Sequence, residues 1–365
     1  AIPAAMFVRR FNYKKGIILG LALYSIGALL FYPAAKFEAF GYFLISLYIL
    51  TFGLAFLETT ASPYIMSMGD EETATRRLNL AQAFNPFGSL LGMFVASNFI
   101  LSKLKSDQRD ISGEIIFNSL GNAEKAIIRT HDLSIISTPY IILGFTVAAM
   151  LILITITKMP SKISESDLSN ELAAFKRLFR NNNYREGVIT QMFYVGAQIM
   201  CWTFIIQYAD KLGMSKAQAQ NYNILAMTIF LTSRFLCTYL MKFISSKKLL
   251  TLFAVGGIIS ILGVIFLNDI KGLYFLVATS AFMSLMFPTI YGLALHGLGN
   301  DTSLGAAGLV MAIVGGALMP PLQGWIVDLE TVGNYKAVNI SFVLPLICFC
   351  VIMIYGYRTL KIHKN

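Results

Sequence analysis

The stretch Leu249-Leu-Thr-Leu-Phe-Ala-Val-Gly-Gly-Ile-Ile-Ser-Ile-Leu-Gly-Val-Ile-Phe-Leu267 contains no charged residue. A helix rises about 1.5 Å per residue, so this stretch is long enough to cross a hydrocarbon core of roughly 30 Å. It is too long for one strand of a membrane barrel, and a helix satisfies all its backbone polar groups internally. The sequence therefore predicts a membrane-spanning helix here.

Similar apolar stretches recur along the whole chain of 365 residues. We count ten, and several exceed the minimum length of about 18 residues, which indicates tilted helices. They lie at approximately 16–33, 41–66, 77–102, 136–157, 187–208, 217–241, 249–267, 271–296, 305–328 and 336–357. An all-α membrane protein built as a helical bundle is expected.

The composition agrees with a protein surrounded by lipid. Hydrophobic residues make up 56% of the chain and charged residues only 13%, whereas a soluble protein carries about 25% charged residues. The net charge of +10 comes from short basic clusters between apolar stretches, which does not indicate a nucleic-acid surface. The cysteines lie inside apolar stretches without metal-ligand spacing, so neither a metal nor a cofactor is expected; they are Cys201, Cys237, Cys348 and Cys350.

Lysine and arginine are distributed unevenly between the two sides of the predicted bundle. They are more numerous on the side that holds the loop Arg9–Lys15. Positive residues gather on the cytoplasmic side of membrane proteins. This loop and the C-terminus are therefore expected in the cytoplasm.

A polar connection at 158–186 divides the chain unequally. Six spans follow it in 187–365, and four spans with an apolar stub, Ala1–Val8, precede it in 1–157. If the two halves match, the first helix and most of the second are missing from the N-terminal half. A 6+6 plan results, and such repeated halves are typical of major facilitator transporters. The segment Pro3–Gly16, with Arg9-Arg10 and Lys14-Lys15, also resembles the motif between the second and third helices of that superfamily.

Glu58 lies inside a predicted span, in Leu57-Glu58-Thr59-Thr60-Ala61-Ser62-Pro63. An ionisable group within the membrane is costly and is a functional hypothesis by default. A low dielectric penalises the ionised form, so this carboxyl group could take up and release protons near neutral pH. A packing carboxyl that is hydrogen-bonded to a neighbouring helix is the alternative.

Arg234 is the second clearly internal charge, in Thr232-Ser233-Arg234-Phe235. It could bind substrate, pair with a carboxylate or anchor helix ends. No intramembrane acid is near it in sequence. Structural and functional roles therefore both stay open.

Amide side chains repeat at intervals of three in 78–86: Asn79, Gln82 and Asn85. This spacing places them on one face of a helix, and amides offer both donors and acceptors to the hydroxyl groups of a sugar. Gln198 and Trp202 lie one turn apart in another span, where an indole ring beside an amide suits a sugar ring. Hydrogen bonds between helices are the alternative for the amides, and an interfacial location is the alternative for Trp202.

Proline and glycine interrupt two late spans, at Phe287-Pro288-Thr289 and at 314–321. Broken helices are tolerated where neighbours or a cavity satisfy the backbone, and in transporters they often border the binding site. Ordinary packing kinks are the alternative. We find no phosphate-binding loop and no His/Cys cluster, so an enzyme is not expected.

These stretches together resemble the fucose–proton symporter family of the major facilitator superfamily. The resemblance extends over essentially the whole chain and also includes 284–290 and Asn300-Asp301-Thr302. It implies a monomeric, multi-pass symporter of the bacterial inner membrane that takes up L-fucose or a related hexose with protons. It further implies that Glu58 handles sugar and proton, and that Gln82 and Asn85 line the cavity.

The sequence departs from the family pattern at two positions. Ser62 stands where many relatives carry Asn, and Phe287 stands where some fucose-specific relatives carry Tyr. The second departure could remove a hydroxyl contact, so the exact sugar is not fixed. Family members also place a second proton-handling Asp in the first helix, the one expected to be missing here.

Other functions remain open beside fucose symport. One is glucose or galactose symport within the same family. Another is a membrane sugar sensor derived from a carrier. A membrane transferase would need paired carboxylates or metal ligands near a membrane surface, and the acidic cluster Asp70-Glu71-Glu72 has no accompanying histidine in its loop.

Overall fold

The structure, a computed structural model, describes residues 1–100, 103–106, 116–159, 171–214, 216–329, 331–332 and 335–361. This part of the chain is almost entirely helical, and nine of its helices are long and apolar enough to cross a membrane. The central part of the predicted linker, 160–170, lies outside the described residues. The all-α membrane fold is confirmed.

The chain forms two compact units, which are described separately. One unit contains Ala1, Pro3–Ala61 and Leu91–Ser164. The other contains Ile2, Ser62–Leu90 and Glu165–Asn365. This division is based on contacts between residues and does not test the halves 1–157 and 187–365 expected from the sequence, which stay a prediction.

The first unit is built from α1 to α4 and from the segment that ends in α8. Its elements are α1 (Ile2–Arg10), α2 (Tyr13–Leu29), α3 (Phe31–Phe37), most of α4 (Phe40–Ser67), the end of α6 (Phe84–Val95), the π-helical turn η2 (Ala96–Ile100), α7 (Ile116–Ser119) and α8 (Asn122–Ile156).

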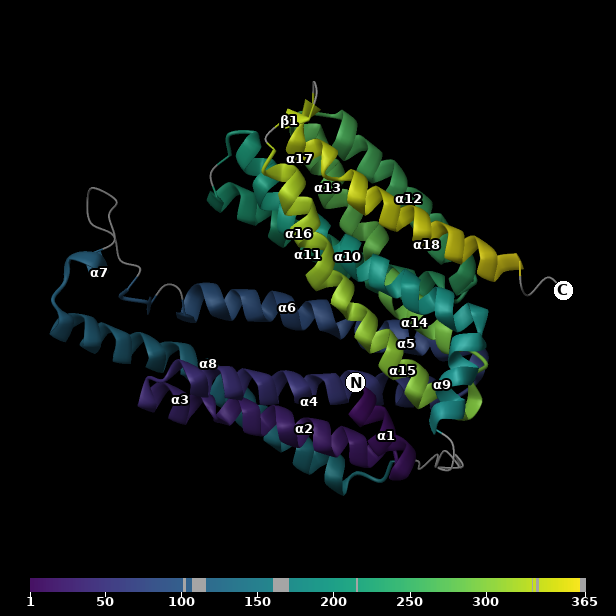
Figure 1. Cartoon of the computed structure of the whole chain (residues 1–365), viewed down its shortest axis with the longest axis horizontal. Helices are drawn as coiled ribbons and strands as arrows, with labels where there is room; N and C mark the ends of the chain where they lie inside the picture. The colour runs from purple at the N-terminus through teal and green to yellow at the C-terminus, as the bar shows by residue number, and fades with distance from the viewer. Residues whose placement is uncertain are drawn as a thin grey trace. The chain divides into compact units, whose positions relative to one another are not determined.

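Close packing and hydrogen bonds to the backbone hold this unit together. Helices α2 and α8 lie side by side (Figure 1), and Ser25 Oγ on α2 donates to the carbonyl of Gly144 on α8 at 2.9 Å. Helices α2 and α4 approach so closely that a Cβ atom on Gly53 would lie 2.5 Å from the Tyr24 nitrogen. Small residues permit this backbone approach, as in other membrane bundles.

The second unit contains the remaining elements. They are the end of α4, η1 (Glu71–Thr73), α5 (Ala74–Gln82), the start of α6, α9 (Glu171–Arg180), α10 (Asn182–Lys211), α11 (Lys216–Leu240), α12 (Ser246–Phe266), α13 (Ile270–Met283), α14 (Met286–Leu295), η4 (Gly299–Asp301), α15 (Thr302–Met311), η5 (Ala312–Val314), α16 (Gly315–Val327), the hairpin strands β1 (Thr331–Val332) and β2 (Tyr335–Lys336), α17 (Ala337–Ile340) and α18 (Val343–Lys361).

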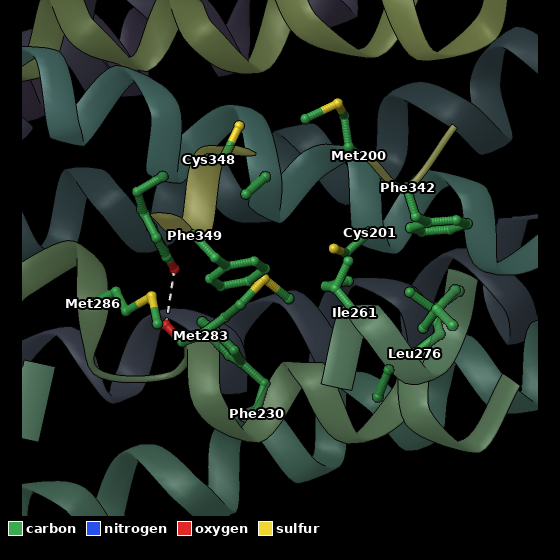
Figure 2. Close-up of a cluster of buried hydrophobic side chains, with 14 of the residues drawn as sticks. Met200, Cys201, Phe230, Ile261, Leu276, Met283, Met286, Phe342, Cys348 and Phe349 are labelled. Carbon is green, nitrogen blue, oxygen red and sulfur yellow. Dashed lines mark hydrogen bonds between the residues drawn. The ribbon is translucent and has the colours of Figure 1, made fainter. Parts of the chain in front are cut away.

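Helix α10 is central to this unit and packs against α11, α14, α16 and α18, while α12 lies along α18 (Figure 1). Side chains of several helices meet in one apolar core. Figure 2 shows Phe230, Met283 and Phe349 of this core pointing toward one another. Cys201, Cys237 and Cys348 are buried as free thiols, which agrees with their expected role as small apolar side chains.

The predicted span 77–102 is the main correction to the sequence analysis. The structure divides it into α5, α6 and η2, with a break at Ala83, so the tenth long span is not present as one helix among the described residues. Pro86 has no N–H to donate to the carbonyl of Gln82, four residues earlier, and this explains a break here. Asn85 therefore lies on a different helix from Asn79 and Gln82, and the expected single amide face is interrupted.

Candidate functional site

Glu58 lies on α4 in the first unit and is half-buried. The neighbouring hydroxyl groups of Thr59 and Thr60 donate to carbonyls of their own helix, those of Ala55 and Phe56, each at 2.7 Å. These threonines therefore have their hydrogen bonds within α4. The carboxyl group of Glu58 is the ionisable group of this polar stretch.

The break between α5 and α6 carries the predicted amides. Gln82 is half-buried at the end of α5, and its Nε2 lies 3.5 Å from Ser62 Oγ. Asn85 is exposed at the start of α6. Asn79 is fully buried and donates from Nδ2 to the carbonyl of Thr75 at 2.9 Å and to Thr289 Oγ1 at 3.2 Å. Gln82 and Asn85 thus keep accessible amides, whereas Asn79 is used between α5 and α14.

A second break separates α13 from α14 at Ser284 and Leu285. Phe287 follows it and is half-buried, with its ring centroid 6.2 Å from that of Tyr194 on α10. The Tyr194 hydroxyl donates to the carbonyl of Met283 at 3.0 Å. Tyr194 therefore supports the break from the side of α10.

Arg234 on α11 is buried, with 3% of its surface exposed. Its Nε donates to the carbonyl of Ser284 at 2.5 Å and its Nη1 to the carbonyl of Gln82 at 2.9 Å. Its guanidinium carbon lies 4.5 Å from the centre of the Phe230 ring. The sequence suggests three roles for Arg234, namely substrate binding, pairing with a carboxylate and anchoring of helix ends. Its two hydrogen bonds to carbonyls at helix ends agree with the third role.

Trp202 on α10 connects to the same group through Phe230. The two rings meet edge to face, with centroids 4.9 Å apart and planes at 83°. Trp202 Nε1 also donates to Ser280 Oγ on α13 at 3.2 Å. Gln198, one turn earlier on α10, is half-buried. Trp202 is therefore held in one orientation by two neighbours.

The structure brings most of the predicted site residues into one unit. Arg234 contacts Gln82 directly, Phe230 bridges Arg234 and Trp202, and Phe287 lies in the helix that begins beside Ser284. Glu58 belongs to the other unit. The described residues contain no group of three or more His, Cys, Asp or Glu side chains that could hold a metal ion.

Sequence reasoning gave no role to Tyr194, Phe230, Ser280 or Thr289. Phe230 precedes Arg234 by four residues, a spacing that places both on one helix face, so it could have been found. Ser280 and Thr289 have no such signal, because their partners Trp202 and Asn79 are far away in sequence.

These features define a multi-pass helical membrane protein with polar groups gathered at broken helices. Residues 1–312 match the model of the Major Facilitator Superfamily. The chain belongs to this family of membrane transporters.

Three known proteins give a finer comparison. The chain is 62% identical over 365 residues to the L-fucose-proton symporter of Haemophilus influenzae, covering 100% of this chain and 85% of that protein. It is 31% identical over 360 residues to the glucose/galactose transporter of Brucella abortus, with 98% and 81% covered. The solved structure of FucP, a major facilitator transporter in the outward conformation, has a TM-score of 0.90 at 34% identity, covering 98% of this chain and 86% of that one.

These matches also bear on the predicted truncation. They extend over the whole of this chain or nearly so. They cover 85% of the Haemophilus influenzae protein and 86% of the FucP chain. They give no support to the expectation that the first helix and most of the second are missing, which stays a prediction.

Proposed function

We propose that this protein is a secondary transporter that takes up L-fucose together with protons by alternating access. It is a carrier and not an enzyme. The observation that supports this most strongly is the high identity, over the full length of the chain, to the L-fucose-proton symporter of Haemophilus influenzae. The polar groups at the two helix breaks supply the chemistry that a sugar requires.

The sugar-binding residues in this proposal are Gln82, Asn85, Gln198, Trp202 and Phe287. Gln82 and Asn85 present amides at the first break, where they can donate to and accept from sugar hydroxyls. Trp202 is held by Ser280 and Phe230, so its ring is preorganised to receive the apolar face of a sugar. Phe287 adds an apolar wall at the second break.

Glu58 is the proposed proton and substrate group. A neutral carboxyl is favoured in a low-dielectric bundle, and ionisation is favoured when water enters. Uptake follows the proton gradient if loaded and empty carriers reorient more easily than half-loaded ones. The coupling ion is the proton, and no other cofactor is part of the proposal.

The remaining proposals concern location and assembly. The protein lies in the bacterial inner membrane as a monomer surrounded by lipid, with its C-terminus in the cytoplasm. The two halves 1–157 and 187–365, joined by 158–186, rock about the sugar site in the middle of the bilayer.

The test is the external pH of a lightly buffered, anaerobic suspension of cells that express the protein. Addition of L-fucose is expected to make the medium more alkaline, because protons enter with the sugar, and cells without the protein give no change. A response to glucose or galactose but not to fucose would support the alternative named for the Brucella abortus relative. No change in external pH with any sugar, in cells whose membranes contain the protein, would contradict proton-coupled transport and favour a sugar sensor.

A further inference from the structure

Both helix breaks have the same cause. Pro86 lies four residues after Gln82, and Pro288 lies four residues after Ser284. A proline has no N–H, so in each case the carbonyl four residues earlier loses its intrahelical donor. A buried carbonyl without a partner is costly inside a membrane, where water cannot replace the missing donor.

Arg234 donates to both of these carbonyls. Its Nη1 binds the Gln82 oxygen and its Nε binds the Ser284 oxygen. One planar guanidinium with fixed donor directions can serve two acceptors at once. The same side chain therefore replaces the two hydrogen bonds that Pro86 and Pro288 remove.

The two helix ends also explain how a buried cation is tolerated. Gln82 is the last residue of α5 and Ser284 is the C-terminal cap of α13. The C-terminal end of a helix carries about half a negative charge, so two ends offer about one. The face of the Phe230 ring adds a further favourable contact to the buried guanidinium.

We propose that Arg234 is a positioning residue that fixes both helix breaks and thereby holds the sugar site in its binding geometry. On the α5–α6 side it fixes the backbone between Gln82 and Asn85. On the α13–α14 side it fixes the start of the helix that carries Phe287. This role rests on the proposed function for its meaning in transport, but the capping itself does not depend on it.

A direct sugar contact by Arg234 is the competing explanation, and a double-mutant cycle separates the two. In the Pro86→Ala/Pro288→Ala background, each alanine can donate its own N–H to the freed carbonyl. If Arg234 acts by capping, its removal weakens sugar binding much less in this background than in the native one. If Arg234 binds sugar directly, its removal weakens sugar binding equally in both backgrounds.

The first measurement is the half-saturation concentration for sugar in counterflow, with the maximal rate recorded beside it. Arg234→Met is expected to raise the half-saturation concentration about tenfold in the native background, and less than about threefold in the double-alanine background. Arg234→Lys is expected to fall between, since an ammonium group keeps the charge but loses the planar fork. Equal losses in both backgrounds, or no loss from Arg234→Met in the native one, would overturn the proposal.

The second measurement is the thermal unfolding temperature of the purified variants in detergent without sugar. Arg234→Met is expected to lower it, and the two proline substitutions to recover part of the loss. Pro139→Ala is the matched control, because Pro139 lies inside α8 in the other unit, so its effect on the unfolding temperature should be the same with and without the Arg234 side chain. If the unmutated protein moves no sugar, the proposed function fails, while this thermal cycle still confirms or refutes the capping.

Discussion

Asn79 Nδ2 on α5 donates to Thr289 Oγ1 on α14 at 3.2 Å, and both side chains are fully buried. This hydrogen bond links residues 210 positions apart in the sequence. It also means that an amide expected to face sugar is used to hold two helices together.

Thr289→Val should lower the free energy of unfolding by about 1 kcal/mol, because the buried Asn79 amide loses one acceptor while side-chain volume is preserved. The measurement is a denaturant titration of the purified protein in mixed detergent. Thr279→Val is the control, since Thr279 is equally buried but donates only to the carbonyl of Phe275 in its own helix. An equal loss in both variants would show that the link between α5 and α14 contributes nothing.

Arg177 and Asp301 form a two-pronged ion pair, with Nε–Oδ2 at 2.8 Å and Nη2–Oδ1 at 2.9 Å. The Asp301 side chain is 10% exposed and that of Arg177 is 59% exposed, and the hydrogen bonds with Asp301 raise the pKa of Arg177. Arg177→Gln should therefore destabilise more than Asp301→Asn, because it leaves a buried carboxylate without its partner whereas the free arginine returns to water. Unfolding temperatures measured at one pH decide this, and the reverse order would contradict it.

Gly53→Ala should lower the free energy of unfolding by about 1–3 kcal/mol, because the added methyl group meets the backbone of α2 and cannot turn away. A denaturant titration of the purified protein in mixed detergent measures this change in the free energy of unfolding. Gly92 on α6 has open space where a Cβ would lie, so Gly92→Ala should be neutral or stabilising by up to about 1 kcal/mol. A harmless Gly53→Ala would mean that α2 and α4 are not held at this distance.

Glu58→Gln should abolish alkalinisation on sugar addition, because an amide cannot carry the coupled proton. Exchange of labelled for unlabelled sugar across vesicles should continue, since exchange needs no net proton movement. The control is Glu72→Gln, which removes an exposed carboxylate from the loop after α4. Normal proton-coupled uptake by Glu58→Gln would remove Glu58 from the mechanism.

Phe287→Tyr should raise the preference for L-fucose over glucose and galactose by roughly threefold to tenfold, because a hydroxyl added beside the site can bond one sugar better than another. Competition of each sugar against labelled fucose measures the change. Phe235→Tyr is the control, since Phe235 is partly exposed on α11 and contacts Phe84 instead. An unchanged order of sugars would place Phe287 outside the specificity site.

Hydropathy alone predicts the helical membrane fold well, because lipid forces long, continuous apolar segments. It fails at 77–102, where average hydropathy does not register that a single proline removes one hydrogen bond. Pro86 can be read from the sequence, but Pro63 and Pro139 lie inside the unbroken helices α4 and α8, so a proline alone does not predict a break. A periodicity of three for Asn79, Gln82 and Asn85 assumes an unbroken helix, and the assumption is wrong at Ala83.

The contacts of the site were less predictable. Internal charged residues such as Glu58 and Arg234 stand out in apolar stretches, so they can be identified as candidates directly from the sequence. The partners of Arg234 cannot be predicted from the sequence, because every residue has a backbone carbonyl. Which carbonyls come near the guanidinium depends on how α5, α11 and α13 pack. The sequence predicts Trp202 beside the sugar. Its hydrogen bond to Ser280 is not predictable, because it too depends on the packing of α10 and α13.

The two hydrogen-bond acceptors of Arg234 described above, the carbonyls of Gln82 and Ser284, are parts of the main chain, and this matters for a protein that handles protons. A carbonyl group has no proton to gain or lose in the physiological range, whereas a carboxylate partner would be neutralised as acid accumulates outside the cell. The hydrogen bonds that hold the two breaks therefore persist at any external pH that the proton gradient imposes. If Glu58 carries the coupled proton, as proposed, its change of charge would leave the hydrogen bonds of Arg234 to these two carbonyls in place.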